Sequence, residues 1–422
     1  MRILFSKLTS LWLRGAGLAL LLSTAPAWAQ TQTTLLPTEA QAKVWITQHA
    51  QVRLALRQQA VQAAAANRLR AGPHETVLRL GGAQRRDDVQ RYGEQDVALE
   101  RALRWGNKRQ LDQTLGTQTE KVALLMLADA RHEAGRALLQ GWFDWLVLRE
   151  KVQIVQKQAD ILQEQQRATQ KRVKVGDAAK SEQVLAEAAL ASTEQSLAEA
   201  QQRLSLLVSQ LQAQFPGLQF IAPDWANRPA PNALTDSQGA WVERLVNANH
   251  ELLLAQAEAE KAGTHAQRVR ADRMPDPSVG VRFSNERAGA EKVAGVYVAI
   301  PFSGAARSSA SQQATAESLW YGDQAQIIEA RLRVEAAALW QQTQQSVESW
   351  QRAQRSQTHL QTYASMLTRG YQMGEGALNE VLLARRQALE AALIEVETWG
   401  RAWHQLYRLR LDAHEFWDFD QD

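Results

Sequence analysis

The chain contains no cysteine among its 422 residues. Disulfide bonds, thiol catalysis and thiolate metal sites are therefore excluded, and so is a lipid attached to an N-terminal cysteine. A long apolar run is also missing after the N-terminal region. The best candidate, Leu124–Leu148, contains six ionisable side chains, which excludes an α-helical membrane protein for this part of the chain.

Catalytic motifs are missing as well. There is no Gly-rich phosphate loop, no nucleophile elbow and no pair of catalytic carboxylates. The eight histidines form no local pair with metal-ligand spacing. We therefore expect no enzyme activity, no cofactor and no metal site. The acidic segment 413–422 is expected to be a hydrated tail, with weak divalent-metal binding as the alternative.

Residues 1–29 have the pattern of a secretory signal peptide. Three basic residues precede the apolar run Leu18–Leu22, and Ala27-Trp28-Ala29 provides a cleavage site. An N-terminal anchor helix is the alternative, but the apolar run is shorter than the roughly 20 residues that a span requires. Without the leader, 45 basic residues face 45 acidic ones, so charge gives no reason to expect a nucleic-acid partner.

A sequence motif occurs twice. KRVKVGDAAKSEQVL (171–185) matches RGYQMGEGALNEVLL (369–383) at an offset of 198 residues. Upstream, PHETVLRL (73–80) matches PDPSVGVR (275–282) at an offset of 202 residues. Such self-similarity predicts one structural unit built twice, over residues 30–212 and 239–412, with a linker over residues 213–238.

Composition predicts long helices in each unit. The chain is rich in Ala, Gln, Leu, Glu and Arg, which favour helix. Helices are expected over residues 38–71, 109–172, 180–212, 239–272, 308–371 and 378–412. Two of them would be about 90 Å long, and heptad-spaced leucines such as Leu190, Leu197 and Leu204 favour coiled-coil packing. The helical tryptophans are expected to be packing contacts.

Each unit also contains one predicted β-hairpin, at about 75–103 and 276–302. The expected strands are Thr76–Ala83, Asp96–Leu103, Ser278–Ser284 and Val293–Pro301, with polar loops over 85–93 and 285–292. Strands of this length can cross a bilayer when tilted. Four strands cannot close a barrel, and hydrocarbon does not tolerate an open sheet edge. Spanning strands would therefore require oligomerisation; a secreted helical protein with two surface hairpins is the alternative.

The element order, repeated twice after a signal peptide, resembles the TolC family of outer-membrane efflux factors. The resemblance extends over essentially the whole chain after residue 29. It is most specific in PDPSVGVRFSNERAGAEKVAGVYVAIPF (275–302) and in the two copies of the motif. Residues 91–112, RYGEQDVALERALRWGNKRQLD, are similar to the cobalt–zinc–cadmium branch. The resemblance implies a homotrimer that is mainly α with a small membrane β part, a twelve-stranded β-barrel in outer-membrane lipid continued by a twelve-helix α-barrel.

The resemblance also assigns roles to the repeated motif. The turns at about 173–180 and 371–378 would be periplasmic tips that contact an adaptor protein. The implied docking residues are Arg172, Val175, Gly176, Asp177, Ser181, Met373, Gly374, Glu375 and Asn379. Glycine suits such turns because it permits positive φ. Helix–helix turns without a docking role are the alternative.

Three further residues match the closed entrance of such channels. We expect Tyr371 to reach Glu182, and Glu380 to form a threefold acidic constriction that favours cations. Solvated glutamates on helix faces are the alternative. Other members of the family carry an arginine where this chain has Gly376. The arginine–carboxylate lock of those members is therefore missing, and a weaker closed state is expected.

The function that the resemblance implies is a passive channel in the outer membrane of a Gram-negative bacterium. It would dock onto a periplasmic adaptor and an inner-membrane pump of the resistance–nodulation–division type. Divalent heavy-metal cations are the first expected substrate, and drugs or organic solutes come next. A type I protein-secretion channel and a non-channel periplasmic adaptor are the competing functions.

Overall fold

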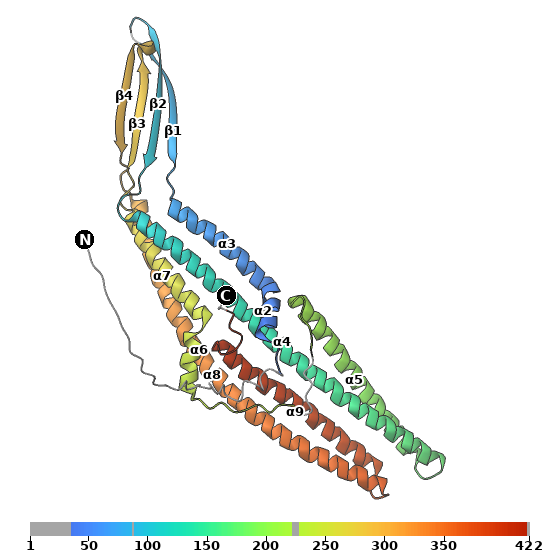
Figure 1. Ribbon diagram of the computed structural model, residues 1–422. Coiled ribbons are helices and arrows are strands. Elements are labelled where there is room, and N and C mark those ends of the chain that lie inside the picture. Colours follow the sequence, from blue (N-terminus) through green and yellow to red (C-terminus); the bar gives the residue numbers. More distant parts are fainter. Residues whose placement is uncertain (1–34, 87, 222–227, 420–422) are drawn as a thin grey trace, which may run out of the picture.

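The computed structural model describes residues 35–86, 88–221 and 228–419, so the predicted signal peptide and part of the predicted linker lie outside the described residues. The molecule is elongated and mostly helical. A four-stranded sheet lies at one end, and the two turns that connect pairs of long helices lie at the other (Figure 1). The expected fold class, mainly α with a small β part, is confirmed.

The same order of elements occurs in both repeats. The first contains α2 (Glu39–Gln48), α3 (Ala50–Ala71), β1 (Thr76–Arg86), β2 (Arg91–Ala102), α4 (Lys108–Lys174) and α5 (Lys180–Gln214). The second contains α6 (Gln238–Asn247), α7 (His250–Ala271), β3 (Ser278–Glu286), β4 (Glu291–Ala299), α8 (Ala305–Gln372) and α9 (Leu378–Asp412). None of the described helices is long and apolar enough to cross a membrane.

Two predicted helices are each broken into two. The first is interrupted at His49, whose backbone is extended (φ −61°, ψ 136°). The second is interrupted at Ala248–Asn249, where the Asn249 side chain accepts a hydrogen bond from the Leu252 N–H. Asparagine favours such caps over helix interiors because its side chain competes for backbone hydrogen bonds. The two breaks occupy equivalent places in the repeats, and the prediction of continuous helices was wrong.

The long helices α4 and α8 set the length of the molecule. They contain 67 and 68 residues, about 100 Å at 1.5 Å per residue. Toward the sheet, α3 packs on α4 and α7 packs on α8. Toward the other end, α5 takes the place of α3, and α9 takes the place of α7 (Figure 1).

The sheet separates apolar from polar side chains. Its strands are antiparallel in the order β1-β2-β3-β4, and residues paired in register point to the same face. One face carries exposed apolar residues: Leu78, Leu80, Val97, Leu99, Val279, Val281, Phe283, Val296 and Val298. The other carries Arg79, Asp96, Glu100, Arg282 and Tyr297, with two exposed valines, Val77 and Val293, among them.

The polar face is internally paired, and all four strands extend further toward the hairpin loops than predicted. The Arg79 guanidinium lies 2.5 Å from Glu100, and Tyr297 Oη donates to the same carboxylate at 2.6 Å. Further along, Arg85 lies 2.8 Å from Glu94. The predicted polar loops 85–93 and 285–292 are therefore partly wrong, because ladder pairing continues as far as Arg86–Arg91 and Glu286–Glu291.

The base of the sheet joins the two repeats. Asp276 accepts hydrogen bonds from His74 Nε2 (2.7 Å), Lys108 Nζ (2.7 Å) and the Trp105 N–H (2.9 Å). Burial alone would raise the pKa of Asp276, but these hydrogen bonds lower it to about 2. His74 and Asp276 hold equivalent positions in the duplicated segments, so the repeats contact each other through corresponding residues.

The core lies near the middle of the rods, where tryptophans attach irregular segments to the helices. The indole N–H groups of Trp399 and Trp403 donate to the Pro229 carbonyl at 2.8 and 3.0 Å. Trp142 donates to the Leu35 carbonyl at 2.8 Å. The expected packing role is confirmed for Trp142, Trp399 and Trp403, and their hydrogen bonds hold the linker and the N-terminal segment in place.

The C-terminal segment is not a hydrated tail over residues 413–419. Trp417 and Phe419 are buried, and the Trp417 indole donates to the Pro37 carbonyl at 3.3 Å. Asp412, which precedes the segment, contacts His132 and Arg136. Burial would raise the pKa of Asp412, but these two partners lower it to about 2. The expectation failed because the two aromatic rings outweigh the charge of the segment.

Close helix packing at glycine gives a first test. A Cβ atom at Gly400 in α9 would overlap Cγ2 of Val147 in α4, whereas at Gly263 in α7 it would lie 3.7 Å from Ser318 Oγ. We expect Gly400→Ala to lower stability by about 1–2 kcal/mol through overpacking. Gly263→Ala should be neutral or stabilising by up to about 1 kcal/mol, because alanine favours helix.

The measurement is thermal unfolding of both variants in detergent, followed by circular dichroism. A lower melting temperature is expected for the Gly400 variant alone. Equal shifts in the two variants would contradict the close approach of α4 and α9.

Candidate functional site: the paired helix tips

Both repeated motifs form the same turn. At the end of α4, the Asp177 N–H donates to the Arg172 carbonyl at 2.8 Å, and the Gly176 N–H donates to the Val173 carbonyl at 3.1 Å. At the end of α8, Glu375 and Gly374 donate to Gly370 and Tyr371 at 2.9 and 3.1 Å. These pairs of bonds define Schellman motifs, which place the residue after the C-cap in the left-handed region.

Glycine suits the backbone of these turns. Gly176 has φ 80° and Gly374 has φ 86°, so the positive φ expected from the sequence is present. Gly376 also has positive φ, 97°. An arginine at position 376 would be strained in this backbone, so the departure from the family pattern fits the shape of the second turn.

A hydrogen-bond network connects the two tips. Tyr371 Oη, from the second repeat, donates to Glu182 Oε2 at 3.2 Å. Arg172 Nη1 donates to Tyr371 Oη at 2.7 Å, and its Nε donates to Asp177 at 2.7 Å. The Arg172 guanidinium also lies 5.2 Å from the centre of the Tyr371 ring. The expected contact between Tyr371 and Glu182 is present in the structure; its role in gating stays a prediction.

Tyr371 is in its neutral form in this network. Burial raises the pKa of its hydroxyl, and the charge of Glu182 raises it further, while Arg172 acts in the opposite direction. A neutral hydroxyl can accept from Arg172 and donate to Glu182 at the same time. In this network Tyr371 comes from the second repeat, and Arg172, Asp177 and Glu182 come from the first.

The expected docking residues lie on the outside of the tips. Val175 is 80% exposed and Met373 is 66% exposed, so each tip presents one apolar side chain to solvent. Gly176, Asp177, Ser181, Gly374, Glu375 and Asn379 are also exposed. The tips therefore present a polar and charged surface with two exposed apolar side chains. Docking of an adaptor there stays a prediction.

One expected docking residue lies partly inside the tips: Arg172 is half-buried in the contact between them. Glu380 is exposed at the start of α9, and its place in a threefold acidic constriction stays a prediction. Arg172 and Tyr371 are 199 residues apart, so the only sequence signal was the repeat offset, which places them at adjacent points of equivalent turns.

Solved structures share this architecture. The CmeC outer-membrane channel of Campylobacter jejuni superposes with a TM-score of 0.73 at 13% identity, covering 92% of this chain and 87% of that one. The outer-membrane protein VceC of Vibrio cholerae gives 0.70 at 15% identity, covering 90% and 97%. This chain has the fold of an outer-membrane channel. The open state of the MtrE channel of Neisseria gonorrhoeae gives 0.67 at 11% identity, covering 89% and 88%.

Identities this low establish the fold and leave the function to be argued from the site. No protein-family model matches the sequence. No curated protein matches it either.

The absence of cysteine makes the tip contact directly testable. Spin labels on Val175→Cys and Met373→Cys, with labelled chains diluted in unlabelled ones, report the distance between the two tips. We expect one narrow distance distribution in the parent protein. Tyr371→Phe should broaden it and shift it to longer distances, because Arg172 and Glu182 lose their shared partner.

The matched control is Tyr363→Phe, which removes a hydroxyl from an exposed residue of the same helix. It should leave the distribution unchanged. If Tyr371→Phe and Tyr363→Phe both match the parent, the network does not hold the tips together.

Proposed function

We propose that this protein is the outer-membrane channel of a tripartite efflux system. Three copies would pool four strands each into a twelve-stranded barrel, and their helices would continue as a twelve-helix periplasmic tube. The channel would be a passive conduit without catalysis, and the pump would supply the energy.

The observation that carries the proposal is the distribution of side chains on the sheet. Nine apolar residues are exposed on one face, and paired charges occupy the other. Transmembrane strands alternate in this way, with apolar side chains toward lipid and polar ones toward the lumen. A sheet that stayed in water would leave this apolar face uncovered, which favours aggregation.

The helices support assembly with further copies. On α8, Trp320, Ile327 and Val334 recur every seven residues and are 58–70% exposed. On α3, Leu54 and Val61 have the same spacing and are 64% and 58% exposed. Heptad stripes of this kind pack against a partner helix. Neighbouring copies of this chain would bury them in a closed helical tube.

The tips support docking to a periplasmic adaptor. Val175 and Met373 offer apolar anchors at the end remote from the sheet, and Asp177 and Glu375 add charge beside them. The adaptor would connect the tips to an inner-membrane pump of the resistance–nodulation–division type. These partners follow from the resemblance and from the shape of the tips.

The same tips would close the channel. Contacts among Tyr371, Arg172 and Glu182 hold the helical hairpin α8–α9 against the helical hairpin α4–α5. Separating the two helical hairpins would widen the entrance. Glu380 from three copies would place carboxylates around the axis, which favours cations. The similarity of residues 91–112 to the cobalt–zinc–cadmium branch favours divalent heavy-metal cations as substrate, with drugs or organic solutes next.

Single-channel recording in planar bilayers tests this function. The purified protein is expected to insert and to show small conductance in the closed state. Tyr371→Phe and Glu182→Ala should raise the conductance, because each removes one side of the hydrogen bond between the hairpins. Glu194→Ala, on the exposed face of α5, is the matched control and should leave the conductance at the parent value.

If neither the parent protein nor the two variants conduct ions, the channel function is excluded and a periplasmic adaptor is favoured. If all three conduct ions equally, the protein is a channel, but Tyr371 and Glu182 do not form its gate.

A further inference from the structure

Three histidines that are far apart in the sequence meet where the two repeats join. His132 comes from the middle of α4, His250 is the first residue of α7, and His414 follows the end of α9. One ring nitrogen from each lies within 4.8 Å of the others. The ring centres are 4.8–5.4 Å apart. No two of these histidines are close in the sequence, so local spacing does not reveal the group.

The backbone places His414 in the group at a conformational cost. Its φ is 56°, in the left-handed region that is uncommon for residues other than glycine, although histidine is found there more often than most. The His414 N–H donates to the Leu411 carbonyl at 3.0 Å, and the Glu415 N–H donates to the Arg410 carbonyl at 2.9 Å. This is the Schellman turn of the two tips, with histidine at the position where both tips carry glycine. Strained residues of this kind concentrate at functional sites.

Carboxylates lie against two of the three rings. His132 Nε2 is 3.2 Å from Asp412 Oδ1, and His414 Nδ1 is 3.7 Å from Asp418 Oδ1. The separation at His414 is an ion-pair distance only, whereas the Asp412 carboxylate is within hydrogen-bond distance and fixes the orientation and the tautomer of the His132 ring. The other nitrogen then carries the lone pair, as in most histidines that bind a metal.

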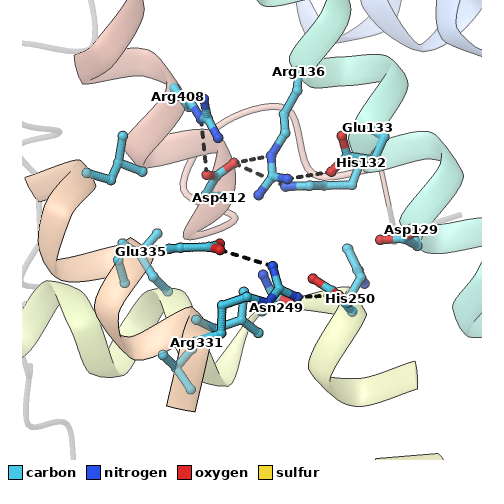
Figure 2. Close-up of a pocket in the computed structure, with 16 residues that line it drawn as sticks. Asp129, His132, Glu133, Arg136, Asn249, His250, Arg331, Glu335, Arg408 and Asp412 are labelled. Carbon is cyan, nitrogen blue, oxygen red and sulfur yellow. Dashed lines mark hydrogen bonds and ion pairs between the residues drawn. The ribbon is translucent and has the colours of Figure 1, made fainter. Parts of the chain in front are cut away.

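The surroundings favour a cation. His132 and His250 line a cavity of about 390 Å³ that α4, α6, α7, α8 and α9 enclose (Figure 2). Five carboxylates and three guanidinium groups line the same cavity: Asp129, Glu133, Glu251, Glu335 and Asp412, with Arg136, Arg331 and Arg408. Arg136 contacts Asp412 and Glu133, so its positive charge is compensated beside the rings.

We propose that His132, His250 and His414 bind one divalent transition-metal ion, with Zn²⁺ as the ion that the donor set fits best. Three imidazoles and a water molecule or carboxylate make a tetrahedral zinc site. Its ligand atoms would be roughly 3.3 Å apart, for zinc–nitrogen bonds of about 2.05 Å. Small side-chain rotations therefore close the group around the ion.

The bound metal would link three segments of the chain that no disulfide bond connects. It would join the first repeat through α4, the break between α6 and α7, and the C-terminal segment. The site would lie between the repeats and away from the tips (Figure 1). It would therefore be a structural metal site and not part of the gate. The proposal does not depend on what the channel carries.

Titration of the full-length protein with Co²⁺ and Zn²⁺ tests the site. The protein is purified in detergent without a polyhistidine tag and stripped of metal with a chelator. We expect one Co²⁺ per chain with the intense visible absorption of a tetrahedral site, displaced by one Zn²⁺. Zn²⁺ should also raise the melting temperature, because the ion binds only the folded arrangement of the three histidines.

The decisive variant is His414→Gly, which removes the imidazole and leaves a residue that favours the observed backbone. It should keep the metal-free melting temperature or raise it, while the affinity for Zn²⁺ falls by more than about 100-fold. His250→Gln provides an independent loss of one ligand. His359→Ala, at an exposed histidine of α8, is the control and should bind metal like the parent.

Two results would overturn the proposal. One is a weak, octahedral Co²⁺ spectrum in the parent protein. The other is equal Zn²⁺ affinity in the parent and in both His414→Gly and His250→Gln, which would place the bound metal elsewhere.

Discussion

Two rows of unpaired backbone groups, along β1 and β4, constrain the rest of this structure. Each outer strand has a sheet neighbour on one side only among the described residues, while the apolar face of the sheet is exposed. In hydrocarbon every unpaired N–H or C=O costs several kcal/mol. In water the same edges and face would promote aggregation. The open edges disappear when β1 of one copy pairs with β4 of another, and lipid would then cover the apolar face. The strand directions alternate across the sheet, so this closing pair would be antiparallel like the other three.

Duplication extends the same constraint to the helices. Each repeat supplies one hairpin, and the two hairpins form one sheet only because β2 pairs with β3 and His74 contacts Asp276 at its base. At the opposite end, Arg172 of the first repeat contacts Tyr371 of the second. The repeats are thus fixed to each other at both ends by polar contacts between corresponding regions. Between those ends, the tryptophan-rich core packs the helices together, and the three histidines meet beside it.

The sequence predicted features that depend on local pattern and missed those that depend on distant residues. Alternation located the strands, and Gly176 and Gly374 located the tips, because positive φ there excludes most side chains. The predicted strands stopped too early at the hairpin loops, because charged residues that pair on the polar face resemble loop residues in the sequence. The helix breaks at His49 and Asn249 carry no proline or glycine, so composition concealed them. The histidine group joins three segments, and only the folded chain brings them together.

The central claim is that copies of this chain close the sheet edge to edge. Leu80 and Ala294 share one row across the four strands, through Val97 and Phe283. Strands tilted in a closed barrel are staggered, by roughly four to six residues per copy for three copies of four strands. Because the chain has no cysteine, Leu80→Cys can be combined in turn with a cysteine at position 288, 290, 292, 294, 296, 298 or 300, which covers this stagger in both directions. Oxidation in outer-membrane fractions, followed by denaturing electrophoresis, is the measurement. The account predicts a covalently linked trimer for at least one pair and none for the single-cysteine variants. Monomer alone for every pair would contradict it.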